Sequence, residues 1–554
     1  MKGAALTILL SLCCLTASAQ LVIDGRPVVY DKLTGTLLAT VRESDFGNNC
    51  SYSVKVENDW QMAVINAVVI IDSCLFDFHK ISERKKLTVT MVTPDNQFKN
   101  YTLQFTFLPV IKLTGSFSND YSEGCFQLVT PEDTLSDQLS AQIKWRGGIT
   151  NADGKHKRNY KIKFNEDHRL LGLRNDNNWI LDAGQLDPFR LRNLVAMEIW
   201  NDIATKPYYA NREPKARTGI RGRVVELFLN DEYQGIYNFA ENMDRKQMKL
   251  KKVDSQTKEV HGCLYKAKGW GYAAMWDTLT VNYDNRQENW NVFEVKYPDL
   301  NDNDTTDWST LYNAIDFVVM SSDDDFKRYV ADYFDIPPLI DYSVFLSVLN
   351  AADNAGKNLF WAVYDKAEDK KLTPAVWDLD CTVGQQWFGL LEDTYYSPDS
   401  LRDMNIRLTW RLAELNVDNF ADRLNERYSE LSATVFATDS LIGRYRHYYQ
   451  QMDQSGAKER EERRWSGDSD ILNHTLDMES EMNYIAEWIE HHIDVINQSV
   501  FPLPVKPVIT DSSPQNQHPK SNTTYSLSGQ RLNANVPLKP GIYIRNGRKI
   551  MVRR

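Results

Sequence analysis

Cysteine is scarce in this sequence of 554 residues, which contains seven. Two of the seven lie within the first 20 residues, and the five that follow include no CxxC pair. An odd number without that spacing excludes a cysteine zinc site and a disulfide framework. A single disulfide between Cys50 and Cys74 stays open as an alternative.

Long apolar runs are absent from the chain after its N-terminal segment. Since no later stretch of about 18 apolar residues occurs, the sequence predicts no membrane span. The N-terminus itself has the pattern of a secretory signal. Lys2 supplies the charge, ALTILLSLCCL the apolar core and Ala17-Ser18-Ala19 the cleavage box. We therefore expect a signal peptide over residues 1–19 and a secreted protein.

Excess positive charge is also lacking, because 64 Lys and Arg against 75 Asp and Glu give a net charge of −11. This balance argues against general nucleic-acid binding and is compatible with a basic protein substrate. Apolar side chains are plentiful, with 42% hydrophobic and 11% aromatic residues. The length predicts two or three domains around sizeable cores.

The stretch most indicative of chemistry is 341–384. It opens with an apolar run at helical spacing, followed by a polar loop. Two strand-like runs then follow, LFWAV at 359–363 and LTPAVW at 372–377. The charged turn between them, centred near Glu368, predicts a hairpin.

This hairpin predicts a metal site. With that turn, Asn358 and Asp378 lie opposite each other across the strands. Asp378 and Asp380 share one strand face, since side chains alternate with period two. Together with Asp353 in the loop, they supply three carboxylates and an amide oxygen, a set suited to Mg²⁺ or Mn²⁺. The alternative is a group of solvated loop acids, which is the simpler interpretation for any single Asp but not for the set.

Two spacings are typical of protein kinases. Asp353 precedes Asn358 by five residues, as a catalytic-loop Asp precedes its metal-binding Asn. Asp380 is followed by Gly384 after a strand, similar to the metal-binding Asp-Phe-Gly turn. However, no His-Arg precedes Asp353 and no Phe lies between Asp380 and Gly384, which excludes an ordinary eukaryotic-type kinase.

A candidate phosphate-binding hairpin lies at residues 143–164. Its turn, Arg146-Gly147-Gly148, can offer backbone N–H groups to phosphate. The second strand predicts Tyr160, Ile162 and Phe164 facing inward, and the lysines of opposite parity are Lys157, Lys161 and Lys163. A Lys on a strand after a Gly turn is what a kinase N-lobe uses to hold phosphates. An exposed basic face of an amphipathic strand explains the same pattern.

A helix is predicted after Asp187-Pro188, because Pro is favoured at the first helical position. Glu198 lies on this helix and would pair with the phosphate-holding Lys, as in kinases; a surface Glu is the commoner alternative. Residues 404–500 predict a helical lobe in which His491 and His492 lie on the surface. Residues 244–335 form a charged, aromatic insertion that we expect to decorate the site.

The combination of DNAGKN at 353–358 and WDLDxxxG at 377–384 resembles the spore-coat protein H (CotH) family of atypical secreted protein kinases. Further pieces occur in the family's order: WRGG, KRNYKIKF, NWILDAGQLDPFRLRN and VVELFLNDEYQGIYNFAEN. The resemblance covers roughly 140–385, and the helical segment to about 500 completes a domain of family length.

The resemblance implies an α+β fold with an atypical, protein-kinase-like two-lobed domain over residues 113–500. It implies ATP and Mg²⁺ or Mn²⁺ as cofactors, and transfer of the γ-phosphate to Ser on a protein substrate of basic, Ser-rich character. Asp353 would be catalytic, and the metal ligands would be Asn358, Asp378 and Asp380. The nucleotide-binding candidates are Arg146, Lys157, Lys161, Lys163 and Glu198. An inactive kinase-fold binding protein at the cell surface and a nucleotidyl transferase remain alternatives.

The flanking segments differ in composition from this domain. Residues 20–112 alternate apolar and polar side chains and predict a small Ig-like β-sandwich. Residues 501–525 are rich in Pro, Ser and Asn and predict a linker. Residues 526–554 predict a short β tail that resembles the C-terminal tails of Bacteroidetes secreted proteins, including type IX sorting domains. This resemblance implies attachment at the cell surface, or a periplasmic location, in a Gram-negative bacterium.

Overall fold

The structure is a computed structural model. It describes residues 21–501 except 58, 133–137, 279–281, 387–405 and 469–475, and residues 524–552 except 526–530, 533–536, 539–540 and 546–547. The expected signal peptide lies outside the described residues, as does most of the expected linker. The chain forms two compact units, Met1–Leu503 and Pro504–Arg554.

The N-terminal strands form a β-sandwich. They are β1 (Leu21–Ile23), β2 (Arg26–Pro27), β3 (Val29–Asp31), β4 (Thr36–Thr40), β5 (Cys50–Val56), β6 (Met62–Ile65), β7 (Val68–Ile70), β8 (Ser73–Phe78), β9 (Leu87–Val92) and β10 (Phe98–Thr106). One sheet has the order β2-β1-β5-β8 and the other β3-β4-β10-β9-β6-β7. Alternate residues of β5 and β8 pack against the other sheet in one core, as the sequence pattern predicts.

Cys50 and Cys74 do not form the disulfide that the sequence left open. Both are free thiols. In the pairing of β5 with β8, Cys50 lies opposite Phe78 and Cys74 lies opposite Val54, so the two cysteines are not cross-strand partners. The sandwich therefore depends on its apolar core.

A closed barrel follows the sandwich. Its strands are β11 (Val110–Thr114), β12 (Ser122–Val129), β13 (Leu139–Arg146), β14 (Asn159–Arg169), β15 (Asn175–Asp182), β16 (Gly222–Leu229) and β17 (Glu232–Glu241). The order is β11-β12-β13-β14-β15-β17-β16, and a parallel pair of β11 and β16 closes it. Because β11 begins at Val110, the barrel starts slightly before the boundary expected at residue 112.

The inward and outward faces of β14 agree with the prediction. Tyr160, Ile162 and Phe164 are buried in the barrel core, whereas Lys161 and Lys163 lie on the opposite face. Lys157 precedes the strand, which begins at Asn159, so the alternation does not extend to it.

A five-stranded sheet forms the next part of the fold, with the order β19-β20-β18-β21-β22. Its strands are β18 (Cys263–Ala267), β19 (Asn289–Trp290), β20 (Phe293–Tyr297), β21 (Leu359–Asp365) and β22 (Asp369–Val376). The predicted hairpin is therefore present as β21 and β22. Residues 244–335, which were expected to decorate the site, also build the fold, because β18 from this segment pairs directly with β21 in the sheet.

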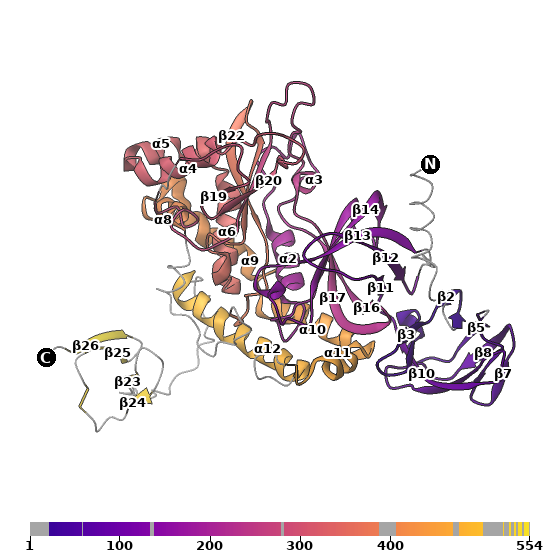
Figure 1. The fold of residues 1–554 in the computed structure, drawn as a ribbon. Helices are drawn as coiled ribbons and strands as arrows, with labels where there is room; N and C mark the ends of the chain where they lie inside the picture. The colour runs from indigo at the N-terminus through magenta and orange to yellow at the C-terminus, as the bar shows by residue number, and fades with distance from the viewer. Residues whose placement is uncertain are drawn as a thin grey trace. The chain divides into compact units, whose positions relative to one another are not determined.

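Helices pack around this sheet and the barrel (Figure 1). They are α2 (Arg192–Ile203), α3 (Arg245–Met248), α4 (Ser309–Met320), α5 (Asp323–Tyr333), α6 (Ile336–Leu349), α8 (Arg407–Glu414), α9 (Phe420–Ser432), α10 (Thr438–Gln454), α11 (Ala457–Trp465) and α12 (Met478–Val495). α6 is buried on nearly every side, which explains its continuous apolar sequence. No helix in the described ranges has both the length and the apolar character needed to cross a membrane.

The two adjacent histidines of α12 have different surroundings. His491 is exposed, as expected. His492 is buried, which corrects the expectation for this residue, and its Nε2 lies 2.8 Å from the carbonyl oxygen of Ser347 in α6. Burial lowers the pKa of His492 to about 4, so this side chain is a neutral packing element.

The second unit contains a four-stranded antiparallel sheet with the order β24-β23-β25-β26. Its strands are β23 (Thr524–Tyr525), β24 (Arg531–Leu532), β25 (Gly541–Arg545) and β26 (Arg548–Val552). The short β tail expected from the sequence thus forms a small sheet.

Helix α11 attaches the C-terminal helices to the barrel at β17 (Figure 1). The buried carboxylate of Glu461 accepts hydrogen bonds from the Ile236 backbone N–H at 2.7 Å, from Lys157 Nζ at 2.9 Å and from Arg190 Nε at 2.7 Å. Arg460 donates to both oxygens of the buried Glu226 in β16 at 2.8 Å. These hydrogen bonds and ion pairs compensate for the free-energy cost of removing the two carboxylates from water.

Gly235 in β17 permits this contact. Its φ is +98°, and a Cβ atom at this position would lie 1.8 Å from Oε2 of Glu461. The carboxylate reaches the neighbouring backbone N–H of Ile236 only because residue 235 has no side chain.

We predict that Glu461→Ala destabilises the domain strongly. Removing one partner from a buried ion network leaves Lys157 and Arg190 uncompensated, which costs on the order of 3–5 kcal/mol. Thermal melting should show a large decrease in Tm. Glu459→Ala on the same helix is the matched control, because Glu459 is exposed and its ion pairs with Lys86 and Arg463 contribute little. Equal Tm values for the two variants would contradict the role assigned to Glu461.

Candidate functional site

Seven of the nine residues predicted for the site line one cleft of about 1200 Å³. Strands and loops of the barrel contribute one wall, and β18, β20 and the ends of β21 and β22 contribute the other. The seven residues are Arg146, Lys161, Lys163, Asp353, Asn358, Asp378 and Asp380.

The loop after α6 positions Asp353. The helix ends at Asn350, whose φ of 50° turns the chain, and the short helical turn Ala352–Asn354 follows. The side chain of Asn354 donates to the carbonyl of Trp377 at 2.7 Å, which ties this loop to the end of β22. The polar loop expected between the helix and the hairpin is thus fixed to the sheet.

Three donors hold the carboxylate of Asp353. Lys357 Nζ lies 2.7 and 2.8 Å from its two oxygens, Asn358 Nδ2 donates at 2.8 Å and Trp270 Nε1 donates at 3.1 Å. The side chain is nearly buried at the cleft wall, with 5% of its surface exposed. Its orientation is therefore fixed before a ligand binds.

The hairpin has a different register from the prediction. Leu359 pairs with Val376, which places Asn358 opposite Trp377 rather than Asp378. The pair Asp365 and Asp369 centres the turn on Ala367, one residue before the centre assumed at Glu368, and the register shift between Val363 and Asp365 makes up only part of this difference.

Asp378 and Asp380 also do not share a strand face, because β22 ends at Val376. Asn358 and Asp378 both adopt left-handed backbone conformations, with φ of 52° and 59°. Asn and Asp tolerate this region better than most residues. Local backbone turns, and not strand alternation, thus place these side chains at the cleft.

Carboxylates crowd this wall of the cleft. Burial, followed by the charges of Asp378, Asp182 and Asp353, raises the pKa of Asp380 well above its usual value. Burial also raises the pKa of Asp182, although a hydrogen bond from Asn193 opposes the shift. A divalent cation would neutralise such a concentration of negative charge.

The donor chemistry of Asn358, Asp378 and Asp380 fits Mg²⁺ or Mn²⁺, which prefer carboxylate and amide oxygens. As the described side chains lie, no three or more from His, Cys, Asp and Glu are grouped closely enough to hold an ion. The metal site therefore stays a prediction that rests on the donor set and on the charge around Asp380.

The opposite wall is basic. Lys144 and Lys161 are direct cross-strand partners, an arrangement in which like charges repel. Burial, followed by the charges of Lys296 and Lys144, lowers the pKa of Lys161 to about 8. On the sheet side, burial lowers the pKa of Lys266 in β18 to about 8, with Asp378 opposing the shift.

These cations lack carboxylate partners. In the described parts of the chain, the ion pairs include none of Lys144, Arg146, Lys161, Lys163 and Lys266. Arg146 and Lys266 instead approach the ring of Trp377, at 5.5 and 5.8 Å from its centroid. Cations that repel one another and have no acidic partner form a wall suited to a polyanion such as a triphosphate.

Sequence reasoning missed three charged residues of the cleft and one residue beside it. Lys144 and Asp182 lie on the barrel side of the cleft, and Lys266 lies on β18 on the sheet side. Asn193 on α2 donates to Asp182 at 2.6 Å and accepts from the Leu379 backbone N–H at 3.0 Å, so it connects α2 to the loop after β22. Asp182 and Asn193 both lie within the stretch NWILDAGQLDPFRLRN, which was the available signal.

The structure corrects the nucleotide-binding roles predicted for Lys157 and Glu198. Lys157 is buried outside the cleft, where it donates to Glu461 and to the carbonyl of Ile236. Glu198 lies on α2 as predicted, but it accepts a hydrogen bond from the Tyr448 hydroxyl at 2.6 Å and pairs with no Lys among the described residues. Packing against the C-terminal helices therefore occupies both side chains.

A comparison with protein-family models matches residues 143–495 to the CotH kinase protein family. The chain belongs to the CotH kinase family. The match covers well over half of the sequence and includes both walls of the cleft. It confirms the resemblance seen in the motifs. No curated protein matches the chain.

The CotH match begins inside β13, so β11 and β12, which complete the barrel, precede it. The family supports a kinase-like function for this domain. The mixed α/β structure is consistent with such a domain, whereas the two-lobed kinase arrangement stays a prediction.

We predict that Asp380→Asn raises the Tm of the metal-free protein near neutral pH. A carboxyl whose pKa is raised on folding binds more protons in the folded state, so the wild type loses stability as pH rises above the usual value of 3.8. The amide does not titrate. The difference in Tm should therefore be small near about pH 4 and grow toward about pH 7 in the presence of a chelator.

Asp332→Asn, at an exposed position of α5, is the control and should show no such pH-dependent gain. A lower Tm for Asp380→Asn at every pH would contradict the crowding of carboxylates.

Proposed function

We propose that this CotH domain is an active protein kinase that transfers the γ-phosphoryl group of ATP to a Ser hydroxyl of a protein. The observation that supports the proposal most directly is the division of charge within the cleft. Among the described residues, the cations on the barrel side that form no ion pair are Lys144, Arg146, Lys161 and Lys163, whereas the carboxylates of Asp353, Asp378 and Asp380 lie on the sheet side. Phosphoryl transfer depends on positioning and on charge stabilisation, which this arrangement provides.

Arg146, Lys161 and Lys163 are proposed to bind the phosphates of ATP from the barrel side. Asn358, Asp378 and Asp380 are proposed to hold Mg²⁺ or Mn²⁺, which when bound neutralises charge on the phosphate oxygens. The opposing charges of the two walls would fix the triphosphate along the cleft.

Asp353 is proposed to orient the acceptor Ser and to take its proton. In this step the Ser oxygen forms a bond to the γ-phosphorus, the bond to the leaving ADP oxygen breaks, and the hydroxyl proton passes to Asp353. The hydrogen bonds from Lys357, Asn358 and Trp270 hold the carboxylate for this role. A fixed base removes part of the entropic cost of the reaction.

We further propose that the protein acts outside the cytoplasm. The secretory pattern of residues 1–19 and the sorting-like tail support export and attachment at the cell surface. The net charge of −11 supports a basic, Ser-rich acceptor.

The central test incubates the full-length mature protein with Mn²⁺, a basic Ser-rich peptide and ATP labelled at either the γ- or the α-phosphate. We predict transfer of the γ-label. Asp353→Asn should still bind ATP, whereas its transfer rate should fall by about 10²–10⁴-fold because the base is lost. Asp378→Asn should instead lose the metal-dependent stabilisation of the protein by ATP, measured as a Tm shift.

Each other outcome of this test has a defined meaning. Transfer of the α-label would replace the proposal with nucleotidyl transfer. Absence of both labels, together with unchanged metal and ATP stabilisation in the two variants, would favour an inactive binding protein.

A further prediction separates the lysines. Lys161→Ala and Lys163→Ala should weaken ATP binding by roughly tenfold each, the usual effect of losing a hydrogen bond to a charged group, with little change in Tm. Lys157→Ala should lower Tm, because Glu461 loses a buried partner. Titration of labelled ATP alongside thermal melting measures both effects. Unchanged affinity in Lys161→Ala and Lys163→Ala would show that the basic wall does not bind the nucleotide.

A further inference from the structure

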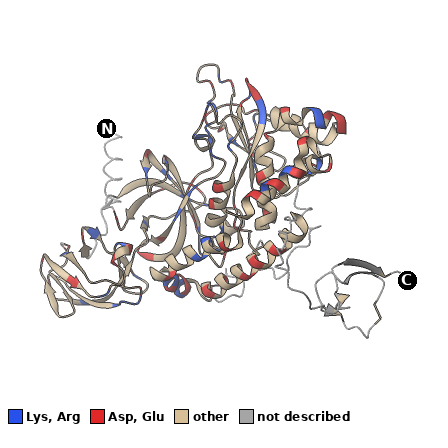
Figure 2. Ribbon diagram, turned by 180° about the vertical axis from the view of Figure 1, so that it is seen from behind, with Lys and Arg blue, Asp and Glu red and all other residues tan. Residues whose placement is uncertain are grey.

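A second cavity, of about 520 Å³, adjoins the cleft. Nine of its twelve lining residues are Lys or Arg, and Asp176 is the single acidic one. We call this cavity the basic groove. Such a concentration is unexpected in a chain of net charge −11, whose acidic and basic positions are otherwise interspersed over the fold (Figure 2).

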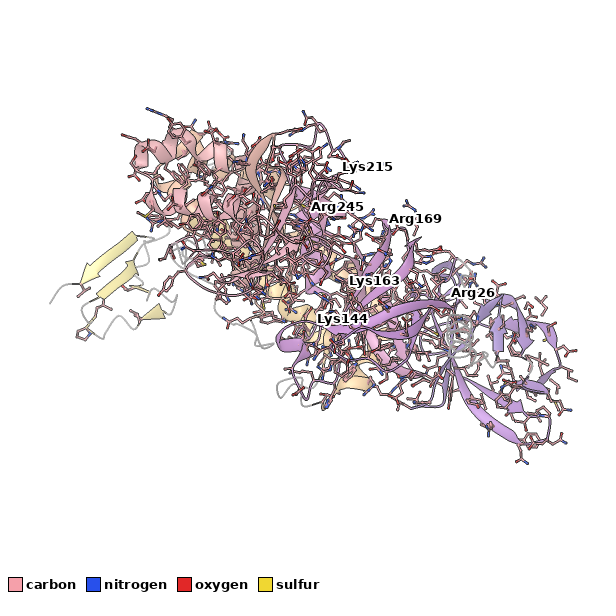
Figure 3. The ribbon with its side chains drawn as sticks, turned by 45° about the horizontal axis from the view of Figure 1, so that its top comes forward. Arg26, Lys144, Lys163, Arg169, Lys215 and Arg245 are labelled. Carbon is pink, nitrogen blue, oxygen red and sulfur yellow. The ribbon has the colours of Figure 1, made fainter. Side chains whose placement is uncertain are left out.

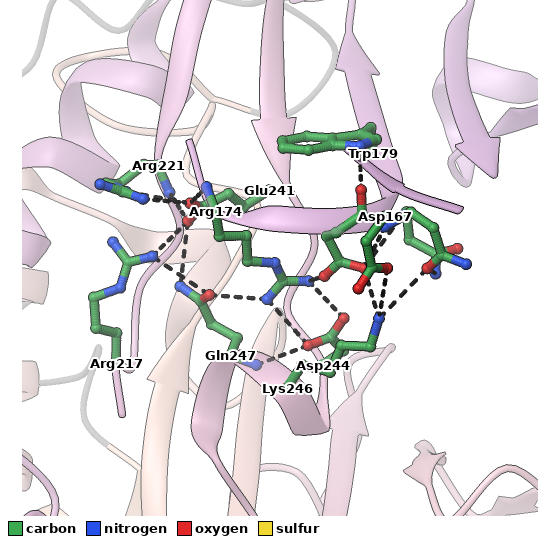
Figure 4. Close-up of polar contacts among 12 residues, drawn as sticks. Asp167, Arg174, Trp179, Arg217, Arg221, Glu241, Asp244, Lys246 and Gln247 are labelled. Carbon is green, nitrogen blue, oxygen red and sulfur yellow. Dashed lines mark hydrogen bonds and ion pairs between the residues drawn. The ribbon is translucent and has the colours of Figure 1, made fainter. Parts of the chain in front are cut away.

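Four of the nine cations have carboxylate partners (Figure 4). Glu241 accepts from Arg217 at 2.7 Å and from Arg221 at 2.9 Å. Arg174 pairs with Asp244 at 2.7 Å, and Lys246 pairs with Asp176 at 2.8 Å. Gln247 also accepts from Arg174 at 2.9 Å. These pairs form a rigid base for the groove.

The other five cations have no acidic partner among the described residues. Three of them, Arg169, Lys206 and Arg245, donate to the backbone carbonyls of Leu173, Ala216 and Leu250. In Figure 3, Arg169 and Arg245 are seen between the lysines of the barrel and Lys215. The five are Arg169, Lys206, Lys215, Arg245 and Lys249.

The groove therefore has a surplus of positive charge. The carboxylates that pair with its nine cations are Asp167, Asp176, Glu241 and Asp244, which leaves five charges uncompensated. Burial and the neighbouring Arg221 lower the pKa of Arg217, although Glu241 opposes the shift. Arg and Lys together suit phosphate, which accepts several charge-assisted hydrogen bonds.

The groove and the cleft share a wall. Asn242, Met243 and Asp244 line the cleft, and the next three residues, Arg245–Gln247, line the groove. Arg221 lines the groove and also a small enclosed cavity that Asp378 lines. An anion in the groove would thus lie close to the segment that bounds the proposed site of transfer.

We propose that the basic groove binds a phosphoserine that the protein substrate already carries, and so directs transfer to a neighbouring Ser. This inference rests on the proposed function. A phosphoserine has about −1.5 to −2 charges at neutral pH and three acceptor oxygens, which match the surplus cations. A basic substrate without phosphate would be repelled by the groove, so selection between the two forms follows from charge.

The test measures binding to the full-length mature protein, without nucleotide, by fluorescence anisotropy of labelled peptides. Three peptides share one basic sequence and carry Ser, Glu or phosphoserine at the same position. We expect the phosphoserine peptide to bind at least about tenfold more tightly than the other two, the effect of one charge-assisted hydrogen bond or more. The combined variant R169A/K206A/K215A should remove this preference.

The matched control is K327A/R328A/R446A, which removes the same charge from exposed positions of α5 and α10. It should keep the preference, and both variants should retain the wild-type Tm. The proposal is overturned if R169A/K206A/K215A binds the phosphoserine peptide as tightly as the control does. It is also overturned if the Glu peptide binds as well as the phosphoserine peptide, since the groove would then select any acid.

A kinetic readout links the groove to transfer. For the phosphoserine peptide with a second Ser, R169A/K206A/K215A should raise KM by about tenfold while kcat stays close to that of the wild type. For the unphosphorylated peptide, KM should not rise, because the variant has fewer groove cations to repel it, and kcat should be unchanged. Binding without any transfer would contradict the proposed function and leave the groove's specificity standing. Transfer without a preference for the phosphoserine peptide would support the proposed function and contradict the specificity assigned to the groove.

Discussion

The buried carboxylate of Glu461 joins parts of the chain that are far apart in sequence. Its partners are a barrel strand at Ile236, the segment before β14 at Lys157, and Arg190. Arg190 in turn donates to the carbonyls of Gly184 and Gln185 at 2.9 Å, and these two residues line the cleft. The shape of the cleft behind the barrel wall therefore depends on a charge that lies outside it. Because that charge is desolvated, it is stable only while all its donors are present.

The cleft itself is organised in the opposite way. Although Lys357 pairs with Asp353, the cleft also brings charges of the same sign together on both sides, which is electrostatically unfavourable without a ligand. Lys144 faces Lys161 across two strands, and Asp380 lies near other carboxylates. Nucleotide with its metal would offset both repulsions at once. The fold keeps the walls in place through neutral and fully paired contacts, such as the one from Asn193 to Asp182.

Local patterns predicted the elements that position the site. Alternation correctly placed Lys161 and Lys163 outside the barrel core, and helical spacing with two strand-like runs located α6 and the hairpin. What the patterns could not supply were contacts over long sequence separations. Lys157 has the same strand parity as Lys161 and Lys163, but its partner Glu461 is 304 residues away in the sequence. The register of the hairpin depends on an irregularity near the turn, which the alternation of side chains along a strand does not predict.

The wall between the cleft and the basic groove shows how paired and unpaired charges divide their roles. Asp244 accepts from the backbone N–H of Gln247 at 2.8 Å and pairs with Arg174, so its charge fixes the start of α3. The cations on either side, Lys161 toward the cleft and Lys215 toward the groove, have no such partner among the described residues. Paired charges thus hold the wall, and five of the nine groove cations are left without an acidic partner among the described residues. An anion bound on either side would meet a wall whose acidic residues, Asp244 and Glu241, each accept from more than one donor.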